Sequence, residues 1–561
     1  MKLFITITPN LEKLLHNEIK DILRTNKLTL PKFQVFEGGI EIDLTKDPNI
    51  SEQEKEYYLW SISNCSRLAE SIRIRVGLSF PCKNFSQFNI NLEKLDYKTY
   101  FPTSSIEPQV AVSCNASTLY HTNAIKERFI KHFNNSIKDK ISIDINYSKF
   151  KPIKKLLKNL RYKLRKIQNP NDDEIIGGGD DHEIIGDDEE LSEEEILNRI
   201  DKLQIELEQV IGKQKNIPQS KVFIRIDQNV GQLSVDACTS GEGQLLHKRT
   251  LNKHISDAPI RETLASAIIM AIISSTRRVG SGTTEGSYLD LNKTNIWDPF
   301  VGSGTLIQEA ISMLLKAKPS SCTNYKRSFQ FERFKNHSTE RYLKYLESIN
   351  KPISPLIKNT ILIGSDIDQK AIDSSIFNLS KQGYQHENIK FFKGDFKSIY
   401  LDQINIDNSL DDDGDNNNNK PFTIITNLPY GTRVLNRNQP QQQQNQPIQP
   451  KATKIKEGEN YYEDDDDDDF FSIRSPKKDN VNIYLNNSIS KDLRDLFKRF
   501  GDMIHESNES VLRDVFVLNG NSHFQSISTN NGKNNFEWER ILNFRNGGLT
   551  VELLKMVKKP N

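Results

Sequence analysis

The chain has 561 residues, of which 36% are hydrophobic and 27% are charged, and its formal net charge is +1. This length allows two to four domains that each bury a core, and the composition fits a soluble protein with polar insertions. The five cysteines are scattered without a CxxC pair and no histidines cluster, so the sequence indicates neither a disulfide framework nor a structural zinc site. The longest apolar run, residues 264–273, is too short to span a bilayer. The N-terminus lacks a signal-peptide pattern, so we expect an intracellular protein of the cytoplasm or nucleus. From the cysteine and histidine pattern and the short apolar run, we expect neither a bound metal nor a membrane contact.

The acidic residues are concentrated in two runs. Thirteen carboxylates lie within residues 172–195, and seven lie within residues 463–469. The rest of the chain is therefore basic, which suits a polyanionic partner such as nucleic acid. The alternative is that acidic loops offset an ordinary basic surface.

Two α/β units are predicted in the N-terminal part. Residues 1–80 show strand-like patterns at 3–8, 40–44 and 69–78 and helical spacing at 11–22 and about 57–63. Residues 81–240 form the second unit, with strands at 110–114, 222–226 and 232–236 and a helix at 123–133. An acidic, glycine-rich insert at about 169–217 interrupts it and is expected to be disordered, apart from a charged, exposed helix at 191–210.

A basic stretch at residues 149–166 is a candidate contact for an RNA backbone. Leucines at helical spacing alternate with its cations, so an amphipathic helix with a solvated basic face explains the pattern equally well. The candidate phosphate contacts are Lys151, Lys154, Lys155, Arg161, Arg165 and Lys166.

From about residue 245 to 561, helices alternate with apolar strands, which predicts a doubly wound, mostly parallel sheet. Pro259 is placed in the first turn of a helix that runs to residue 273. The predicted strands cover residues 296–297, 361–364, 389–392, 422–426 and 511–518. Polar, low-complexity inserts at about 407–420 and 436–479 are expected to be disordered loops.

Acidic and glycine residues follow the first three of these strands. The string Asp298, Pro299, Phe300, Val301, Gly302, Ser303, Gly304, Thr305 predicts a strand end, a glycine turn that a ligand can approach, and a helix start. Asp366 is positioned to bond ribose hydroxyls, although a helix N-cap is the alternative for it or for Asp368. Asp395 ends the third strand, where it could accept from an adenine amine. Three acids at successive strand ends predict an adenosine-binding rim, and the lack of a Walker lysine argues against a nucleoside triphosphatase.

The fourth strand ends in Asn427, Leu428, Pro429 and Tyr430. An amide oxygen, a backbone carbonyl before proline and an aromatic ring can hold a planar exocyclic amine while it is alkylated. An ordinary β-turn is the alternative.

Together these motifs resemble the class I S-adenosylmethionine-dependent methyltransferases, and the Asn-x-Pro-Tyr element resembles their amino-methylating members. Residues 117–125 look like part of a THUMP domain, an RNA-binding module, which implies an RNA contact at His121. Residues 236–267 and 546–549 resemble segments of the bacterial large-subunit ribosomal RNA guanine-N2 methyltransferases. The resemblance implies a Rossmann-like methyltransferase domain preceded by an α+β ferredoxin-like and THUMP region. It also implies S-adenosylmethionine as cofactor, rRNA as substrate, and a role in rRNA processing by RNA methylation.

Leu428 departs from this family, which usually carries proline at that position. Adenine-N6 dimethyltransferases that act on rRNA use Asn-Leu-Pro-Tyr, so adenine-N6 methylation stays an alternative. The other enzyme alternatives are guanine-N2 methylation of tRNA and methylation of protein glutamine. A non-catalytic RNA-binding adaptor with a decayed methyltransferase fold is a further alternative.

Overall fold

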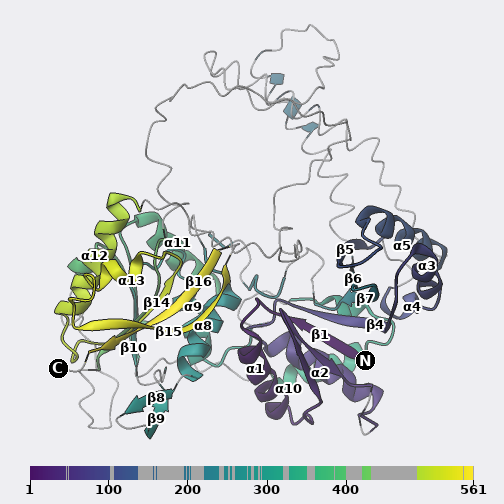
Figure 1. The fold of residues 1–561 in the computed structure, drawn as a ribbon, viewed down its shortest axis with the longest axis horizontal. Coiled ribbons are helices and arrows are strands. Elements are labelled where there is room, and N and C mark those ends of the chain that lie inside the picture. Colours follow the sequence, from purple (N-terminus) through teal and green to yellow (C-terminus); the bar gives the residue numbers. More distant parts are fainter. Residues whose placement is uncertain are drawn as a thin grey trace.

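The computed structural model describes the chain except for residues 46, 49, 102–106, 137–155, 157–159, 161–191, 193–194, 197–198, 201, 204–219, 239–244, 250–252, 255–258, 275, 280–282, 288–290, 292–293, 320–326, 350–359, 385, 400–419, 431–488, 547–548 and 560–561. The described residues form two seven-stranded sheets and a two-stranded hairpin, β8 (Thr276–Val279) with β9 (Thr283–Ser287). The two sheets belong to lobes that lie beside each other (Figure 1). The predicted low-complexity inserts and most of the predicted helix at 191–210 lie outside this description.

The first sheet contains strands from both predicted N-terminal units, in the order β2-β3-β1-β4-β7-β6-β5. Its strands are β1 (Lys2–Thr6), β2 (Phe33–Phe36), β3 (Gly39–Asp43), β4 (Ser71–Pro81), β5 (Gln109–Asn115), β6 (Lys221–Asp227) and β7 (Val230–Asp236). Strand β4 pairs with β1 on one side and with β7 on the other, which makes the sheet continuous. The predicted strands are confirmed, whereas the domain boundary near residue 80 stays a prediction.

Five helices of the described ranges accompany this sheet. They are α1 (Glu12–Thr25), α2 (Glu52–Cys65), α3 (Phe85–Glu93), α4 (Tyr97–Tyr100) and α5 (Thr122–Ser136). The sequence predicts three of them, α1, α2 and α5, but not α3 and α4. Helix α2 begins five residues before the predicted start at about 57, because Ser51 and Glu54 form a capping box there. The Ser51 hydroxyl accepts from the Glu54 amide, and the Glu54 carboxylate accepts from the Ser51 amide at 2.8 Å.

The second sheet confirms the predicted mostly parallel, seven-stranded architecture. Its order is β12-β11-β10-β13-β14-β16-β15, and the strands from β12 to β14 are parallel. The strands are β10 (Asn295–Asp298), β11 (Leu362–Asp366), β12 (Ile389–Lys393), β13 (Phe422–Asn427), β14 (Leu512–Asn519), β15 (Phe536–Asn546) and β16 (Leu549–Lys558). Strand β16 runs antiparallel to both β14 and β15. Only the last two strands of the sheet were not predicted.

Both faces of the second sheet are buried. Successive residues of β13 enter different cores: Ile424 packs with helix α12 (Lys491–Glu506) and α13 (Phe524–Ser528), whereas Ile425 packs with the opposite face. On that opposite face lie α8 (Glu262–Ser274), α9 (Thr305–Leu314) and α11 (Gln369–Lys381). Double-sided burial explains why the parallel strands have continuous apolar sequences.

Helix α8 is the most apolar helix but has only 13 residues. Within the ranges that the structure describes, no helix has both the length and the hydropathy needed to cross a membrane. Pro259 lies before the first residue of α8, Glu262, so its predicted position in the first turn is wrong.

A buried polar network joins the two lobes. The Arg249 guanidinium pairs with Glu309 of α9 and also donates to the backbone carbonyl of Arg67. Arg67 in turn donates to the Ser312 hydroxyl at 2.8 Å, and its backbone amide donates to Glu18 of α1 at 2.6 Å. Because buried charges are costly unless they are paired, these contacts hold the lobes in one arrangement.

Helix α10 (Thr339–Ile349) extends from the second half of the chain onto the first lobe, where it lies beside α2 (Figure 1). The Trp60 ring of α2 lies 5.3 Å from the ring of Tyr342 and 5.8 Å from that of Tyr345. The Arg341 guanidinium forms an ion pair with Glu56. This aromatic contact is a second connection between the lobes.

Gly501 is required where α12 meets α13. A Cβ atom at this position would lie 1.8 Å from the Ser528 carbonyl oxygen. We expect Gly501→Ala to lower the free energy of unfolding by about 1–3 kcal/mol, because the backbones must move apart. The matched control, Lys498→Ala on the exposed side of α12, should stay within about 0.5 kcal/mol of the wild type. Chemical denaturation measures both, and a stabilised Gly501→Ala variant would contradict the packing described.

Candidate active site

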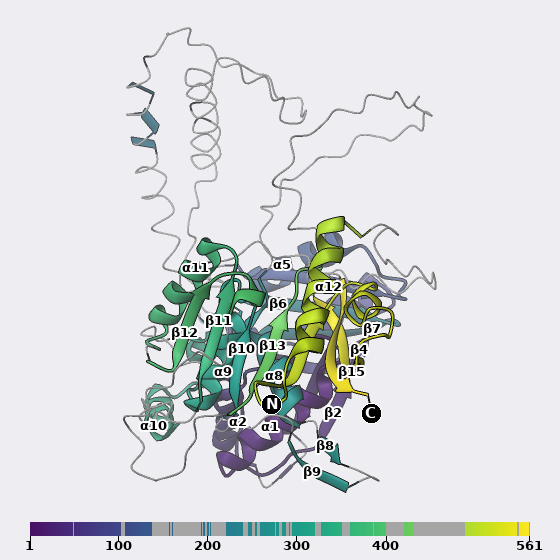
Figure 2. The same ribbon diagram turned by 90° about the vertical axis from the view of Figure 1, so that its left-hand side faces the viewer.

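The predicted cofactor and acceptor residues meet at one edge of the second sheet. Strand β10 lies between β11 and β13, and all three are parallel, so their carboxyl ends lie together (Figure 2). Asp298 ends β10, Asp366 ends β11 and Asn427 ends β13. The chain order reverses on either side of β10, and at such a point open α/β sheets bind their ligands.

The glycine turn after β10 has the predicted form. Gly302 and Gly304 have φ angles of 53° and 79°, in the left-handed region that favours glycine. A Cβ atom on Gly304 would lie 3.0 Å from the Ser375 hydroxyl oxygen. The turn leads directly into α9 at Thr305, so amide groups without an intrahelical acceptor face the strand-end edge.

Asp366 holds this turn in place. Its carboxylate accepts from the Gly302 amide at 3.1 Å and from the Asp368 amide at 3.0 Å. Burial raises the pKa of Asp366, and these two hydrogen bonds oppose the increase. Each oxygen retains a lone pair for a ligand hydroxyl. Asp368, in contrast, is the N-cap of α11 and accepts from the Lys370 amide at 2.9 Å.

Asp395 and Phe300 have partners within the protein. Asp395 caps the short helix η2 (Phe396–Ser398) and pairs with Arg499 of α12. Burial opposes ionisation of Asp395, but Arg499 and the Lys397 amide outweigh it and lower the pKa of this carboxyl. The Phe300 ring packs 5.5 Å from that of Phe396. Asp395 therefore lies at the predicted strand end, but its carboxylate is partly engaged.

Ile367 was not predicted as a site residue. Its side chain is 72% exposed directly after Asp366, which is unusual for isoleucine. An apolar residue beside a ribose-binding carboxylate can cover the face of a base. The sequence feature that could have indicated its exposure is its place between two aspartates, Asp366 and Asp368.

Asp298 connects the glycine turn to β13. It is 2% exposed, and its Oδ1 accepts from Thr426 Oγ1 at 2.6 Å and from the Phe300 amide at 3.2 Å. Burial raises the pKa of Asp298 to about 7, despite these two hydrogen bonds. Thr426 immediately precedes Asn427, and sequence reasoning did not select it.

The tetrapeptide after β13 presents one polar atom without a partner. Asn427 Oδ1 is buried, and no group in the described ranges donates a hydrogen bond to it. Leu428 is 1% exposed and packs in the core with α12. An orphaned buried acceptor is costly, and this one lies at the strand-end edge, so it is a candidate partner for a donor group of a ligand.

Tyr430 is positioned by three neighbours. Asn546 Nδ2 donates to its hydroxyl at 3.3 Å, and Asn521 Nδ2 donates to its carbonyl at 3.4 Å. A Cβ atom on Gly520 would lie 2.9 Å from the Tyr430 ring, so only glycine fits there. These contacts come from β15 and from the loop after β14, and they orient the ring at the strand-end edge.

The predicted RNA contacts fall mostly outside the description. This applies to Lys151, Lys154, Lys155, Arg161, Arg165 and Lys166. His121 is exposed at the start of α5, and its ring lies 4.2 Å from that of Tyr120, which is 62% exposed. An exposed aromatic pair can stack on an unpaired base, and the RNA contact at His121 stays a prediction.

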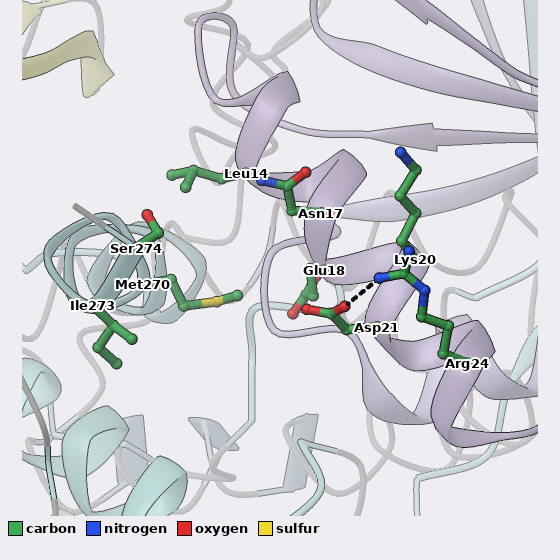
Figure 3. A pocket seen from close by; sticks show the side chains of 9 residues that line it. All are labelled: Leu14, Asn17, Glu18, Lys20, Asp21, Arg24, Met270, Ile273 and Ser274. Atoms are coloured by element: carbon green, nitrogen blue, oxygen red, sulfur yellow. Dashed lines mark hydrogen bonds and ion pairs between the residues drawn. The ribbon is translucent and has the colours of Figure 1, made fainter. Parts of the chain in front are cut away.

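A cavity of about 330 Å³ lies elsewhere, between α1 and α8 (Figure 3). Its lining residues are Leu14, Asn17, Glu18, Lys20, Asp21, Arg24, Met270, Ile273 and Ser274. None of these residues is among the strand-end residues described above, so the cavity is separate from the strand-end site. Across the described part of the chain, no group of three or more His, Cys, Asp or Glu side chains could hold a metal ion.

Comparison with known proteins identifies the kind of domain that contains this site. Residues 249–446 match the family model of the RMKL-like methyltransferase domain. The match includes the glycine turn, Asp366 and the tetrapeptide at the end of β13, so this part of the chain is similar to the methyltransferase domain of that family. The match supports the predicted methyltransferase class of this domain.

Two curated relatives are named ribosomal RNA large subunit methyltransferase K/L. The protein from Marinomonas sp. (strain MWYL1) is 25% identical over 222 residues, which are 39% of this chain and 26% of the relative. The protein from Acinetobacter baylyi (strain ATCC 33305 / BD413 / ADP1) is 25% identical over 231 residues, 40% of this chain and 27% of the relative. The chain thus matches about a quarter of the length of each relative.

Two solved structures share the fold over the whole chain. A possible methylase from Clostridium difficile 630 has a TM-score of 0.55 at 16% identity, covering 100% of this chain and 98% of the other. SMU.472 in complex with SAH has the same TM-score, identity and coverage. At this level of identity the likeness concerns the fold.

Asp298 should make stability depend on pH. Its pKa in the folded protein, about 7, lies above the ordinary value of 3.8, so the folded state binds the extra proton between these values. Stability is therefore lost as pH rises through that window. Asp298→Asn keeps an oxygen acceptor but cannot ionise. Its stability relative to the wild type should increase by roughly 1.4 kcal/mol per pH unit between pH 5 and 7, then level off. Denaturation at several pH values measures this, and parallel pH profiles would contradict a buried, titrating Asp298.

Proposed function

We propose that the protein is an S-adenosylmethionine-dependent RNA methyltransferase that methylates the exocyclic N2 amine of guanosine in ribosomal RNA. The observation that supports this best is the buried, unpaired Asn427 Oδ1 at the end of β13. An exocyclic amine is a donor of the kind that this acceptor lacks. The neighbouring strand, β10, carries the glycine turn, so amine and cofactor would meet.

The residues at the strand ends fit the cofactor. Gly302 and Gly304 permit close approach of a ligand to the backbone, and the Asp366 carboxylate can accept from ribose hydroxyls. Ile367 offers an apolar surface to an adenine ring. The fold is also that of SMU.472, which was solved with SAH. When bound, S-adenosylmethionine supplies a methyl group that is already activated on a sulfonium.

The protein's task is then to orient the acceptor. Asn427 Oδ1 accepts one hydrogen bond from the amine, and the Leu428 carbonyl accepts another. This directs the nitrogen lone pair away from the ring and toward the methyl group. Because an amide oxygen and a peptide carbonyl are very weak bases, both groups position the amine and do not remove its proton. Methyl transfer would break the S–CH3 bond, form the N–CH3 bond and release SAH, and the methylated nitrogen would lose its proton to solvent. Such alignment can contribute many orders of magnitude to the rate.

Tyr430 completes the acceptor site by stacking on the base after it leaves its helix or loop. Its hydrogen bonds to Asn546 and Asn521 hold the ring ready for this contact. An unpaired target nucleotide lowers the cost of extrusion, and RNA is most often read in such regions. The exposed Tyr120 and His121 would bind the RNA farther from the reaction.

Adenine-N6 methylation is the second candidate. Leu428 favours it, because the Asn-Leu-Pro-Tyr form resembles that of the adenine-N6 dimethyltransferases. The Leu428 side chain is buried in the core, so only its carbonyl can reach the amine. The two acceptors, Asn427 Oδ1 and the Leu428 carbonyl, can therefore bind the exocyclic amine of either guanine or adenine. The names of the curated relatives support ribosomal RNA as the substrate. Guanine as the base rests on the sequence resemblance to the ribosomal RNA guanine-N2 methyltransferases.

Nucleoside mass spectrometry tests the proposal directly. The purified full-length protein is incubated with S-adenosylmethionine and with ribosomal or transfer RNA from cells that lack it. We expect N2-methylguanosine to increase in ribosomal RNA only. New N6-methyladenosine would support the second candidate instead. New methylation of transfer RNA would make transfer RNA, not ribosomal RNA, the substrate. No methylated nucleoside in either RNA would contradict an RNA methyltransferase.

Two variants should separate the acceptor and cofactor subsites. Asn427→Ala should lower the turnover number at least 100-fold while SAH affinity stays within about threefold, because Asn427 acts only on the amine. Asp366→Ala should weaken SAH binding at least tenfold, because it removes the ribose acceptor and releases the glycine turn. Calorimetry and single-turnover assays measure the two quantities. If Asn427→Ala lost cofactor affinity to the same extent as Asp366→Ala, the acceptor pocket would be misplaced.

A further inference from the structure

The segment between β7 and α8 brings a cation to the glycine turn. Lys253 Nζ donates to Thr305 Oγ1 at 2.9 Å and to Glu262 Oε1 at 2.8 Å. The Lys253 side chain is only 12% exposed. Thr305 is the first residue of α9 and follows Gly304 directly. A nearly buried ammonium group therefore lies beside the turn that is expected to hold the cofactor.

The neighbouring residue fixes this segment in position. The His254 amide donates to Asn378 Oδ1 at 2.8 Å, and Asn378 Nδ2 donates to the His254 carbonyl at 2.9 Å. Asn378 Nδ2 also donates to the Ser303 carbonyl at 3.0 Å, so one side chain connects the segment and the turn. The His254 ring stacks on Phe377 with 3.9 Å between centroids and an interplanar angle of 9°. Lys253 is thus held at a defined place relative to the turn.

The charges around Lys253 suit a zwitterionic ligand group. An ammonium group has three N–H donors, and within the described part of the chain Thr305 and Glu262 accept two of them. The third, together with the amides at the start of α9, favours an anion. Glu262 is 8% exposed; burial opposes its ionisation, but Lys253 and His247 outweigh it and lower the pKa of Glu262. A carboxylate close to the ammonium can likewise attract a ligand's amino group.

We propose that Lys253 binds the carboxylate of the amino-acid part of S-adenosylmethionine. This inference rests on the proposed function, because it assigns a residue to the cofactor of that reaction. The adenosine part would lie toward Asp366 and the amino-acid part toward Thr305, which places the sulfonium between them, near Asn427. By holding the amino-acid end of the cofactor, Lys253 would set the position of the sulfonium methyl group along the glycine turn.

The test compares two ligands that differ by one carboxylate: SAH and its decarboxylated analogue. Both are titrated calorimetrically into the full-length wild type and into Lys253→Met, which has a side chain of similar length without charge. The wild type should prefer SAH by about tenfold, the usual contribution of a charge-assisted hydrogen bond. Lys253→Met should lose this preference, whereas Lys253→Arg should retain part of it.

Lys344→Met is the matched control. Lys344 has its own carboxylate partner, Glu340, but lies exposed on α10. This variant should keep the wild-type preference. A preference for SAH that persists in Lys253→Met would overturn the assignment, as would a wild type that binds both ligands equally. The comparison of the two ligands on the wild type tests carboxylate recognition even if Lys253→Met does not fold. A wild type that binds neither ligand would contradict the proposed function itself, so the two failures are distinguishable.

Discussion

The hydrogen bond from Thr426 Oγ1 to Asp298 joins the two halves of the candidate active site. Asp298 begins the glycine turn, and Thr426 precedes Asn427, the proposed acceptor residue. Because both partners are almost fully buried and end neighbouring parallel strands, the distance between the two subsites is set by the sheet itself. Methyl transfer from an activated donor depends chiefly on such alignment, so a rigid connection in the core is what this chemistry requires.

Helix α9 extends the same constraint to the first lobe. Its first residue, Thr305, accepts from Lys253, and Glu309 pairs with Arg249, whose guanidinium also bonds the carbonyl of Arg67. The proposed cofactor turn and the N-terminal sheet therefore share one helix as a reference. An RNA held by the first lobe would meet the strand-end site at a fixed distance. The two polar clusters on α9 would thus fix the position of an RNA bound by the first lobe relative to the proposed acceptor residue.

Much of the second lobe was predictable because its strands are buried on both faces. The apolar runs ending at Asp298, Asp366 and Asn427 indicated parallel strands, and the motifs at their ends indicated a common edge. Strand β15 escaped prediction because it is an edge strand with charged residues such as Glu537 and Glu539 on its exposed side. The contacts of Thr426, Lys253 and Asn378 could not be foreseen, since each depends on residues far away in sequence. The ion pair of Asp395 with Arg499, 104 residues later, is of the same kind.

The account depends on Asn427 and the glycine turn forming one site for a base amine and a methyl donor. A crystal structure of the full-length protein with SAH and a guanosine-containing oligonucleotide tests this most directly. We predict that the guanine N2 nitrogen lies within hydrogen-bond distance of Asn427 Oδ1 and of the Leu428 carbonyl, facing the SAH sulfur. A complex in which the base binds far from Asn427, with that oxygen still unpaired, would contradict the account.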